Sequence, residues 1–347
     1  KWSQTLLETP DEPSQTTTAV ILAAGQGTRM RSTLPKVLHP LAGRPLIAYS
    51  LDLARRLGVA QPVVIIGHGA DQVRQAVGSD ARVAVQQPQL GTGHAVQQAE
   101  PLLADFDGLL LVMSADMPLF TYETLRALVD TQRANDGPLT MLTMHLDDSH
   151  GFGRVVRSAN GSVQAIVEEA QATLEQRAIR ELNVGAYCFR ARWLWQALRR
   201  VSLSPKGEYY LTDVVGIAVQ DGLTVRALVL DDHREAIGIN TRVHLAEAEA
   251  ILRQRINAAW MAAGVTLIDP QTTYIEPDAT IGADTVIYPN THLRGTTRVG
   301  ANCVLGPNTI IRDSVIEDGC RVTASVIEET RLPAHSSTGP FEHIVRK

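Results

Sequence analysis

The sequence contains few cysteines, no long apolar run and no excess of basic charge. Three of its 347 residues are cysteine (Cys188, Cys303 and Cys320), which cannot form a closed set of disulfides, so a reducing cytoplasm is the expected compartment. No uninterrupted apolar segment is long enough to cross a bilayer, and the first residues lack the apolar core of a signal peptide. The net charge of −5, without a long basic run, argues against nucleic acid as a partner. The composition, 44% hydrophobic and 20% charged, is typical of a soluble globular protein, and the length suffices for two domains.

Several short patterns that mark enzyme classes are also missing. The glycine-bearing stretch 19–38 lacks the Gly-x-x-x-x-Gly-Lys-Ser/Thr pattern of a P-loop, and Met30 stands where a dinucleotide-binding fingerprint has its third glycine. His39, His68 and His94 do not have the spacing of metal ligands, so we expect them to be packing or surface residues. These absences argue against a P-loop enzyme, a dinucleotide-binding protein and a histidine metal centre.

One stretch near the N-terminus carries chemistry of another kind. An apolar run over 19–24 predicts a strand buried on both faces, and it leads directly into a loop with Gly25 and Gly27. Glycines leave backbone N–H groups accessible to a ligand, and Arg29 and Lys36 add two cations beside them. Amides and cations together favour a polyphosphate ligand. Taken alone, the loop is also compatible with an ordinary strand-to-helix turn.

Strands and helices alternate through the first part of the chain. After 19–24, further apolar runs predict strands at 62–67, 83–86 and 109–113, and amphipathic patterns predict helices at 46–57, 70–77 and 91–104. This alternation is typical of a doubly wound α/β domain, in which ligands bind at the carboxyl ends of the strands. The glycine loop, Gly91 with Thr92, and Asp116 all fall at or just past such ends.

The last part of the chain has a different period. A long helix is predicted over 243–263. Aliphatic residues then recur at every sixth position: Ile275, Ile281, Ile287, Leu293, Val299, Leu305 and Ile311. Four residues after each of the first six stands a small residue: Ala279, Thr285, Thr291, Thr297, Cys303 and Thr309. This hexapeptide repeat predicts a β-helix in which each strand buries one aliphatic side chain, and the register slips near 314–316.

The full string Leu-Ala-Ala-Gly-x-Gly-Thr-Arg-Met, beginning at Leu22 and followed by Pro-Lys-Val-Leu from Pro35, resembles the signature of the sugar-1-phosphate nucleotidyltransferases. Within that family it is most similar to the bacterial N-acetylglucosamine-1-phosphate uridylyltransferases. The resemblance runs from about residue 19 to the end. It implies a Rossmann-like α/β domain, doubly wound on a mixed sheet, followed by a short left-handed parallel β-helix that forms homotrimers. The domains expected are a flexible leader (1–18), the nucleotidyltransferase domain (19–242), a linker helix (243–264) and a truncated β-helix (265–347).

The resemblance also implies a reaction and the residues that perform it. UMP would pass from UTP to N-acetylglucosamine 1-phosphate, giving UDP-N-acetylglucosamine and pyrophosphate. The attacking phosphate oxygen is already an anion, so the site needs charge neutralisation and positioning rather than a general base. The implied catalytic residues are Arg29, Lys36 and Asp116. The implied substrate-binding residues are Leu22, Ala23, Ala24, Gly25, Gln86, Gly91, Thr92, Ser114, Ala115, Gly153, Glu168, Asn183, Tyr210, Thr212 and Asn240.

Metal binding is implied for Asp116 and Asn240. Mg²⁺ takes few carboxylates together with phosphate oxygens and waters, and an amide oxygen is an acceptable hard ligand. On the sequence alone, an aspartate at a strand end is more often a turn or cap residue. Within the resemblance, Gln86 is expected to read the uracil edge, because an amide offers both a donor and an acceptor. Gly153, Glu168 and Asn183 are expected to hold the sugar.

Three positions depart from the family pattern, and two other functions remain open. Ala115 replaces a glycine before the aspartate, Ala170 a lysine after the sugar-site glutamate, and Val184 a threonine after the site asparagine. These changes bear on sugar and base selectivity. The alternatives are another sugar-1-phosphate nucleotidyltransferase, using glucose 1-phosphate with UTP or dTTP, and a non-catalytic sugar-nucleotide-binding subunit. In the family, later coils carry an acetyltransferase, and we expect this activity to be absent from the chain.

Overall fold

The structure is a computed structural model that describes residues 16–147 and 151–346. The chain divides into two compact units. The first comprises Lys1–Leu38 and Leu46–Gly238, and the second comprises His39–Pro45 and Ile239–Lys347. In the described part of the chain, no helix has the length and apolar character needed to cross a membrane.

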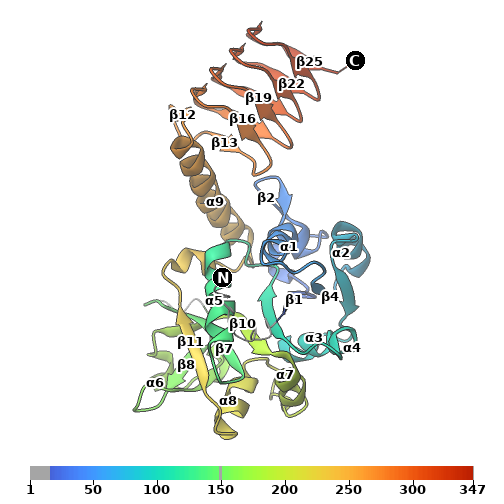
Figure 1. The fold of residues 1–347 in the computed structure, drawn as a ribbon, viewed down its shortest axis with the longest axis vertical. Coiled ribbons are helices and arrows are strands. Elements are labelled where there is room, and N and C mark those ends of the chain that lie inside the picture. The colour runs from blue at the N-terminus through green and yellow to red at the C-terminus, as the bar shows by residue number, and fades with distance from the viewer. Residues whose placement is uncertain (1–15, 148–150, 347) are drawn as a thin grey trace, which may run out of the picture. The chain divides into compact units, whose positions relative to one another are not determined.

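The first unit is built on a nine-stranded mixed sheet whose main path has the order β11-β7-β10-β6-β1-β4-β5 (Figure 1). Strands β1, β4, β5 and β6 are mutually parallel where they pair, and β10 runs antiparallel between β6 and β7. β8 and β9 form a hairpin that pairs with β10. The strand bounds are β1 Thr17–Ala23, β4 Val63–Ile66, β5 Arg82–Val85, β6 Leu109–Ser114, β7 Leu139–His145, β8 Arg154–Arg157, β9 Val163–Val167, β10 Glu181–Arg190 and β11 Val225–Val229.

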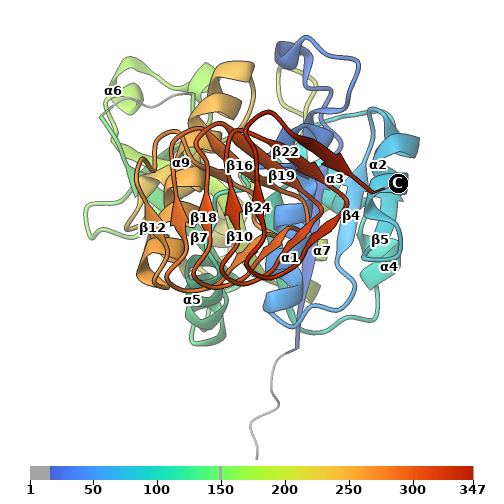
Figure 2. The same ribbon diagram turned by 90° about the horizontal axis from the view of Figure 1, so that it is seen from above.

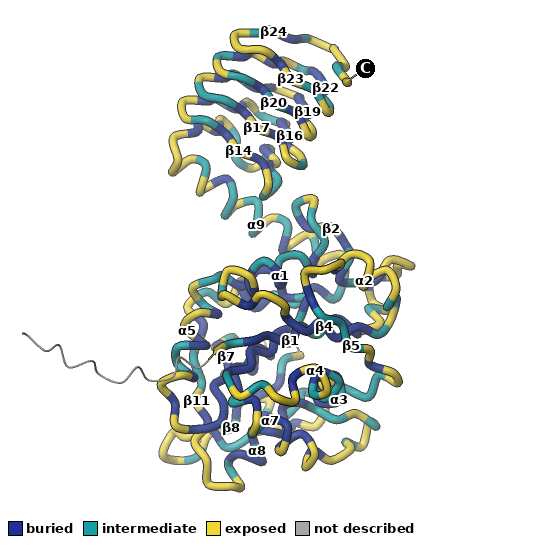
Figure 3. Tube along the Cα trace, turned by 45° about the vertical axis from the view of Figure 1, so that its right-hand side comes forward, coloured by how far each residue is buried: buried dark blue, intermediate teal, exposed yellow. Residues whose placement is uncertain are grey.

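Helices cover both faces of this sheet, and the predicted doubly wound architecture is confirmed. Apolar residues of α1, α2 and α5 pack on one face, whereas those of α3, α4, α7 and α8 pack on the other. The central strands are buried along their length (Figure 3). The helix bounds are α1 Leu46–Arg56, α2 Ala70–Val77, α3 Thr92–Gln97, α4 Glu100–Leu103, α5 Tyr122–Arg133, α6 Leu174–Arg177, α7 Ala191–Leu198 and α8 Asp213–Gln220. Short 3₁₀ helices are η1 Thr28–Met30, η2 Lys36–Leu38, η3 Glu169–Gln171 and η4 His233–Ala236.

The predicted helix over 91–104 is wrong in one respect, because the structure divides it into α3 and α4. Pro101 stands in the first turn of α4. A proline lacks the backbone N–H that a helix interior requires, but a first turn tolerates it. The break at Gln98 and Ala99 therefore places the proline where it costs no hydrogen bond.

The second unit contains the helix α9 (Arg242–Ala262) and a parallel β-helix of the left-handed hexapeptide-repeat class (Figure 1; Figure 2). Its strands form three parallel sheets with the orders β12-β15-β18-β21-β24, β13-β16-β19-β22-β25 and β14-β17-β20-β23. The strand bounds are β12 Thr266–Leu267, β13 Tyr274–Ile275, β14 Thr280–Ile281, β15 Val286–Ile287, β16 Thr291–Arg294, β17 Arg298–Val299, β18 Val304–Leu305, β19 Thr309–Arg312, β20 Val315–Ile316, β21 Arg321–Val322, β22 Val326–Glu328, β23 Arg331–Leu332, β24 Ser337–Thr338 and β25 His343–Val345.

The hexapeptide period and its slip are confirmed, and two further slips were not predicted. Each aliphatic of the repeat lies inside the coil, and Ile287 stacks on Leu305 of the next coil. The interval from Ile311 to Ile316 is five residues instead of six, as the sequence indicates. Two more short intervals follow, from Val322 to Ile327 and from Ile327 to Leu332. These intervals are harder to find in the sequence because several aliphatic residues there fit either register.

The small residues of the repeat are buried for a specific reason. All six, including Cys303, are at most 2% exposed, which confirms that this cysteine is a core residue. The threonine hydroxyls satisfy nearby backbone carbonyls: Thr285 donates to Gly300 at 2.9 Å, and Thr297 donates to Arg294 at 2.6 Å. A buried hydroxyl without such a partner would be destabilising. The position therefore accepts a threonine as readily as an alanine or a cysteine.

Two neighbouring isoleucines of β19 provide a test of the inward and outward faces. Ile311 is fully buried, whereas Ile310 is half-buried on the outer face. We expect Ile311→Ala to lower the free energy of unfolding of the β-helix by about 2–5 kcal/mol, because it leaves a cavity, and Ile310→Ala by about 1 kcal/mol or less. Denaturant unfolding followed by circular dichroism measures both. Equal losses from the two substitutions would contradict the assigned register.

The structure differs from the predicted domain boundaries at three places. The main segment of the second unit already begins at Ile239 and not after residue 242. Residues 1–15 of the predicted leader lie outside the described residues, whereas Thr17 and Thr18 already belong to β1, because they pair with β6. The hairpin of β2 (Pro40–Leu41) and β3 (Arg44–Pro45) belongs to the second unit. Within that unit, the Ala42 N–H donates to Glu249 of α9 at 2.6 Å, and Arg44 lies 3.7 Å from Asp278.

Candidate active site

The carboxyl ends of the parallel strands bring the predicted nucleotide-side residues together. Leu22 of β1 lies beside Ser114 of β6, and Ala23 lies beside Ile66 of β4. The Ala24 carbonyl beyond β1 accepts from the Gln89 side chain at 2.6 Å and from the His68 N–H at 3.3 Å. The loop that starts at Gly25 thus leaves the sheet at one edge, with the ends of β4, β5 and β6 around it.

An ion pair within this edge joins two residues that are far apart in the sequence. The Lys36 ammonium contacts Oδ2 of Asp116, and the Ser114 hydroxyl donates to Oδ1 at 2.6 Å. Both charged side chains are largely buried, with 11% of Lys36 and 18% of Asp116 exposed. Ala115, which lies between Ser114 and Asp116 in the sequence, is fully buried, and its N–H donates to the Leu22 carbonyl at 3.0 Å. Both oxygens of the Asp116 carboxylate are therefore held in place, while part of the side chain remains accessible to solvent.

Gly27 makes room for this lysine. Its φ is +62°, and a Cβ at this position would lie 2.7 Å from Cβ of Lys36. We expect Gly27→Ala to lower turnover by roughly tenfold or more, because the backbone is strained and the lysine is displaced from Asp116. Gly58→Ala is a matched control, since Gly58 also has a positive φ (+83°) and its Cβ would meet nothing within 4 Å. Equal losses of turnover in the two variants would show that strain alone causes the effect.

Gln86 and Gly91 lie together, although the arrangement differs from a simple base-reading role. Gln86 is 4% exposed, and its Nε2 donates to the Gly91 carbonyl at 2.9 Å and lies 3.2 Å from Nδ1 of His94. The amide thus supports the Gly91 loop. His94 is half-buried against this amide, and Gln89 is a supporting residue that the sequence did not single out. The role of Gln86 toward a base stays a prediction.

The Gly91 loop is closed onto the segment that carries Tyr210. The Gly93 N–H donates to the Tyr209 carbonyl at 2.8 Å, and the Leu211 N–H donates to the Thr92 hydroxyl at 3.0 Å. Gly91 has a φ of +95°, and a Cβ there would lie 2.6 Å from the Tyr209 carbonyl oxygen. The approach of the two backbones therefore requires a glycine. This contact joins the nucleotide-side residues to the sugar-side residues.

The residues predicted to hold the sugar, called the sugar-side residues below, gather at the amino end of β10. Asn183 is buried; its N–H donates to the Gly153 carbonyl at 2.8 Å, and its Nδ2 donates to the Tyr187 hydroxyl at 2.7 Å. Burial raises the pKa of Tyr187, so this hydroxyl stays protonated at neutral pH. The sequence did not reveal Tyr187, because an aromatic residue in an apolar strand looks like an ordinary core residue. Val184, a departure from the family pattern, is buried beside Asn183.

Two carboxylates, those of Glu168 and Asp213, lie close to each other. Oε1 of Glu168 accepts from the Thr212 hydroxyl at 2.9 Å. Burial and the negative charge of Glu168 raise the pKa of Asp213, and burial is the main cause of a raised pKa at Tyr210. Carboxylates accept hydrogen bonds from hydroxyl groups and repel phosphate. This group therefore suits the hydroxyls of a sugar, whereas Lys36 and the glycine loop suit phosphates.

Two predicted site residues take no part in the contacts described above for the Lys36–Asp116 pair and for the sugar-side residues. Arg29 on η1 is exposed and forms no ion pair with the described residues. Asn240 belongs to the second unit, where its N–H donates to Nδ1 of His244 at 3.4 Å, and its role as a metal ligand stays a prediction. Within the described residues, no group of three or more His, Cys, Asp or Glu could hold a metal ion. A lone, positioned carboxylate such as Asp116 fits an ion that takes its other ligands from phosphates and water.

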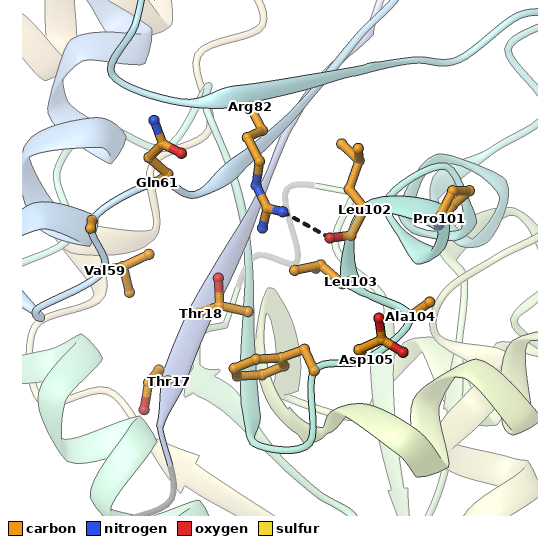
Figure 4. A pocket seen from close by; sticks show the side chains of 12 residues that line it. Thr17, Thr18, Val59, Gln61, Arg82, Pro101, Leu102, Leu103, Ala104 and Asp105 are labelled. Carbon is orange, nitrogen blue, oxygen red and sulfur yellow. Dashed lines mark hydrogen bonds between the residues drawn. The ribbon is translucent and has the colours of Figure 1, made fainter.

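A cavity of about 380 Å³ lies elsewhere, at the amino end of β1 (Figure 4). Thr17 and Thr18 line it, together with Arg82, whose Nη1 donates to the Leu102 carbonyl at 2.8 Å. In a sheet of this class ligands bind at the carboxyl ends of the strands. The cavity is therefore at the wrong end of β1 to belong to the site.

Comparison with known proteins identifies the family. Residues 19–201 match the MobA-like NTP transferase domain, and residues 278–313 match the six-repeat bacterial transferase hexapeptide family. The chain is 47% identical over 327 residues to the bifunctional protein GlmU of Exiguobacterium sibiricum, covering 94% of this chain and 73% of that protein. It is 46% identical to GlmU of Bacillus subtilis, with coverages of 94% and 72%.

A crystal structure of a Bacillus anthracis protein described as a glucose-1-phosphate thymidylyltransferase has the same fold, with a TM-score of 0.57 and 20% identity, over 68% of this chain and 95% of that one. Both predicted parts, the nucleotidyltransferase domain and the hexapeptide repeats, thus have family counterparts. Together with the glycine loop and the Lys36–Asp116 pair, these relationships show that the chain is a nucleotidyltransferase and belongs to the GlmU family.

Proposed function

We propose that the chain transfers UMP from UTP to N-acetylglucosamine 1-phosphate and releases pyrophosphate. The observation that carries this proposal is the Lys36–Asp116 pair, which lies beside the glycine loop at the carboxyl edge of the sheet. It combines one positioned carboxylate, one largely buried ammonium and a loop with accessible amides. These are the groups that a reaction between two phosphates requires.

The reaction forms one P–O bond and breaks another. A phosphate oxygen of the sugar phosphate attacks the α-phosphorus of UTP, and the bond from that phosphorus to the bridging oxygen breaks. Pyrophosphate leaves with the electron pair. The nucleophile is already an anion, so no side chain has to remove a proton. Lys36 and Arg29 neutralise the triphosphate and the departing pyrophosphate, and the Gly25 loop offers backbone N–H groups to the phosphates.

Enzymes of this family use a divalent metal ion, and we propose Mg²⁺ as that ion. When bound, it would neutralise phosphate charge and orient phosphate oxygens. Asp116 is the residue of the first unit that would hold it. Ser114 and Lys36 fix the two carboxylate oxygens, so the ligand is oriented before the ion binds. Asn240 stays the second ligand that the family resemblance implies.

Selectivity for the sugar would come from the residues around the amino end of β10. Glu168 and Thr212 form one hydrogen-bonded pair, and Asn183 with Tyr187 forms another. Together they present a carboxylate, an amide and a hydroxyl to the sugar hydroxyls and the acetamido group. Ala170 is exposed on η3, beyond Glu168, so the missing lysine at this position removes a charge from the rim of the group.

Pyrophosphate release over a matrix of nucleotides and sugar 1-phosphates tests the proposal. We expect the highest kcat/KM with UTP and N-acetylglucosamine 1-phosphate in the presence of Mg²⁺. Preference for glucose 1-phosphate or dTTP would replace the substrates while keeping the reaction class. Binding of UDP-N-acetylglucosamine without turnover of any pair would indicate a non-catalytic binding subunit.

The second unit would serve assembly. We propose a homotrimer formed through the β-helix, because hexapeptide-repeat proteins commonly associate in this way and because Ile268 and Tyr288 of the coils are 53% and 40% exposed. Light scattering coupled to size exclusion measures the mass. The expected absence of acetyl transfer stays a prediction, and incubation with acetyl-CoA and glucosamine 1-phosphate, followed by measurement of free thiol, tests it.

A further inference from the structure

A buried arginine directly follows Gly153, one of the predicted sugar-side residues. Arg154 on β8 is 2% exposed, forms an ion pair with Glu169, and donates from Nη1 to the Phe152 carbonyl at 2.8 Å. Its Nε is buried and has no hydrogen-bond partner among the described residues. Neither Arg154 nor Glu169 was singled out by the sequence.

The ion pair joins backbone positions next to two predicted sugar ligands, and a third is hydrogen-bonded to one of them. Arg154 directly follows Gly153, and Glu169 directly follows Glu168. The Gly153 carbonyl accepts from the Asn183 N–H at 2.8 Å. A single interaction thus ties the β8 strand to the segment that presents the Glu168 carboxylate.

The two partners of the ion pair are buried to different extents. The buried arginine therefore restrains the more exposed glutamate. The Arg154 side chain is almost completely buried, whereas 39% of the Glu169 side chain is exposed. An unpaired buried guanidinium is costly, so the arginine retains its carboxylate partner strongly. Because Glu168 caps η3 with extended backbone (φ −64°, ψ 144°), holding Glu169 also fixes the backbone from which the Glu168 side chain reaches Thr212.

We propose that Arg154 is a positioning residue for the sugar 1-phosphate. Through Glu169 it fixes the Glu168 carboxylate against Thr212, and it thereby sets the affinity for the sugar without acting on the nucleotide. This inference rests on the proposed function, since it assigns Glu168 to the sugar.

Arg154→Met tests the proposal, because methionine fills the buried space with an unbranched side chain and removes the charge. We expect the KM for N-acetylglucosamine 1-phosphate to rise about tenfold, with the KM for UTP and the kcat at saturation changing by about twofold or less. Glu169→Gln should raise the same KM, and the double variant should resemble Arg154→Met, because the two residues act through one interaction.

Arg157→Met is the matched control. Arg157 lies on the same strand and forms two hydrogen bonds of 2.6 Å with the buried Glu181. Burial raises the pKa of Glu181, but the hydrogen bonds and charge of its neighbours, Arg157 foremost, outweigh it, so the pKa of Glu181 is lowered and the side chain stays ionised. Its loss should reduce the melting temperature and leave the KM for the sugar phosphate within about twofold of the wild type.

The outcomes separate this inference from the proposed function. A wild-type chain that releases no pyrophosphate with any sugar phosphate removes the function itself. An active wild type with an unchanged sugar-phosphate KM in folded Arg154→Met, or with both KM values raised equally, overturns the positioning role alone. Should Arg154→Met not fold, Glu169→Gln carries the same decision, since Glu169 is partly exposed.

Discussion

Asp116→Asn is expected to lower turnover by at least about 100-fold while leaving the fold intact. The substitution keeps the shape of the side chain and its contact with Ser114, but it removes the negative charge that faces Lys36 and the proposed metal ion. Steady-state pyrophosphate release at several Mg²⁺ concentrations measures the effect, and circular dichroism with the melting temperature establishes that the variant is folded.

Asp130→Asn serves as the control for this prediction. Asp130 lies on α5, pairs with Arg126 and Arg133, and is 44% exposed. Its loss removes an acidic group from the surface, so turnover should stay within about twofold of the wild type. Normal Mg²⁺-dependent turnover in folded Asp116→Asn would contradict the role of this residue in the site.

Arg29→Ala is expected to lower kcat by roughly 30- to 100-fold, with a smaller change in the KM for the sugar phosphate. Arg29 is exposed on η1 directly after the glycine loop. Its proposed task is to neutralise charge on the triphosphate and on the departing pyrophosphate, which increases as the bond breaks. Initial rates over both substrate concentrations separate the two parameters.

Arg31→Ala is the matched control for Arg29, because Arg31 is also exposed and lies two residues further along the same turn. We expect its kcat to remain within about threefold of the wild type. An Arg29→Ala variant that changes only the KM for the sugar phosphate would place the arginine at the other substrate.

Local patterns determined much of the fold. The apolar runs of β1, β4 and β6 predict strands because each is long enough to be buried on both faces. The six-residue period predicts the β-helix because it fixes which side chain of each coil points inward, and Ile287, Leu293 and Leu305 are indeed fully buried. These features depend on residues close together in the sequence, so the sequence alone specifies them.

The tertiary structure decided which distant residues meet. Lys36 and Asp116 are 80 residues apart, and their pairing depends on the adjacency of β1 and β6. The residues around Asn183 gather because β10 runs antiparallel between β6 and β7, a connection that no local period encodes.

The division between sequence and tertiary structure is also clear in the sugar-side residues and in the hairpin 39–45. The resemblance named Glu168 and Asn183, but Tyr187 and Arg154 became recognisable only once their hydrogen bonds and burial were known. The hairpin's membership of the second unit likewise follows from contacts with α9 and Asp278, which lie more than 200 residues away. By itself, the sequence determined the strands, the coils and the glycine loop, because short-range periodicity sets the face each residue presents. Only the tertiary structure decided the ion pairs and supporting contacts of the site, because these depend on strand order and on the burial of charges.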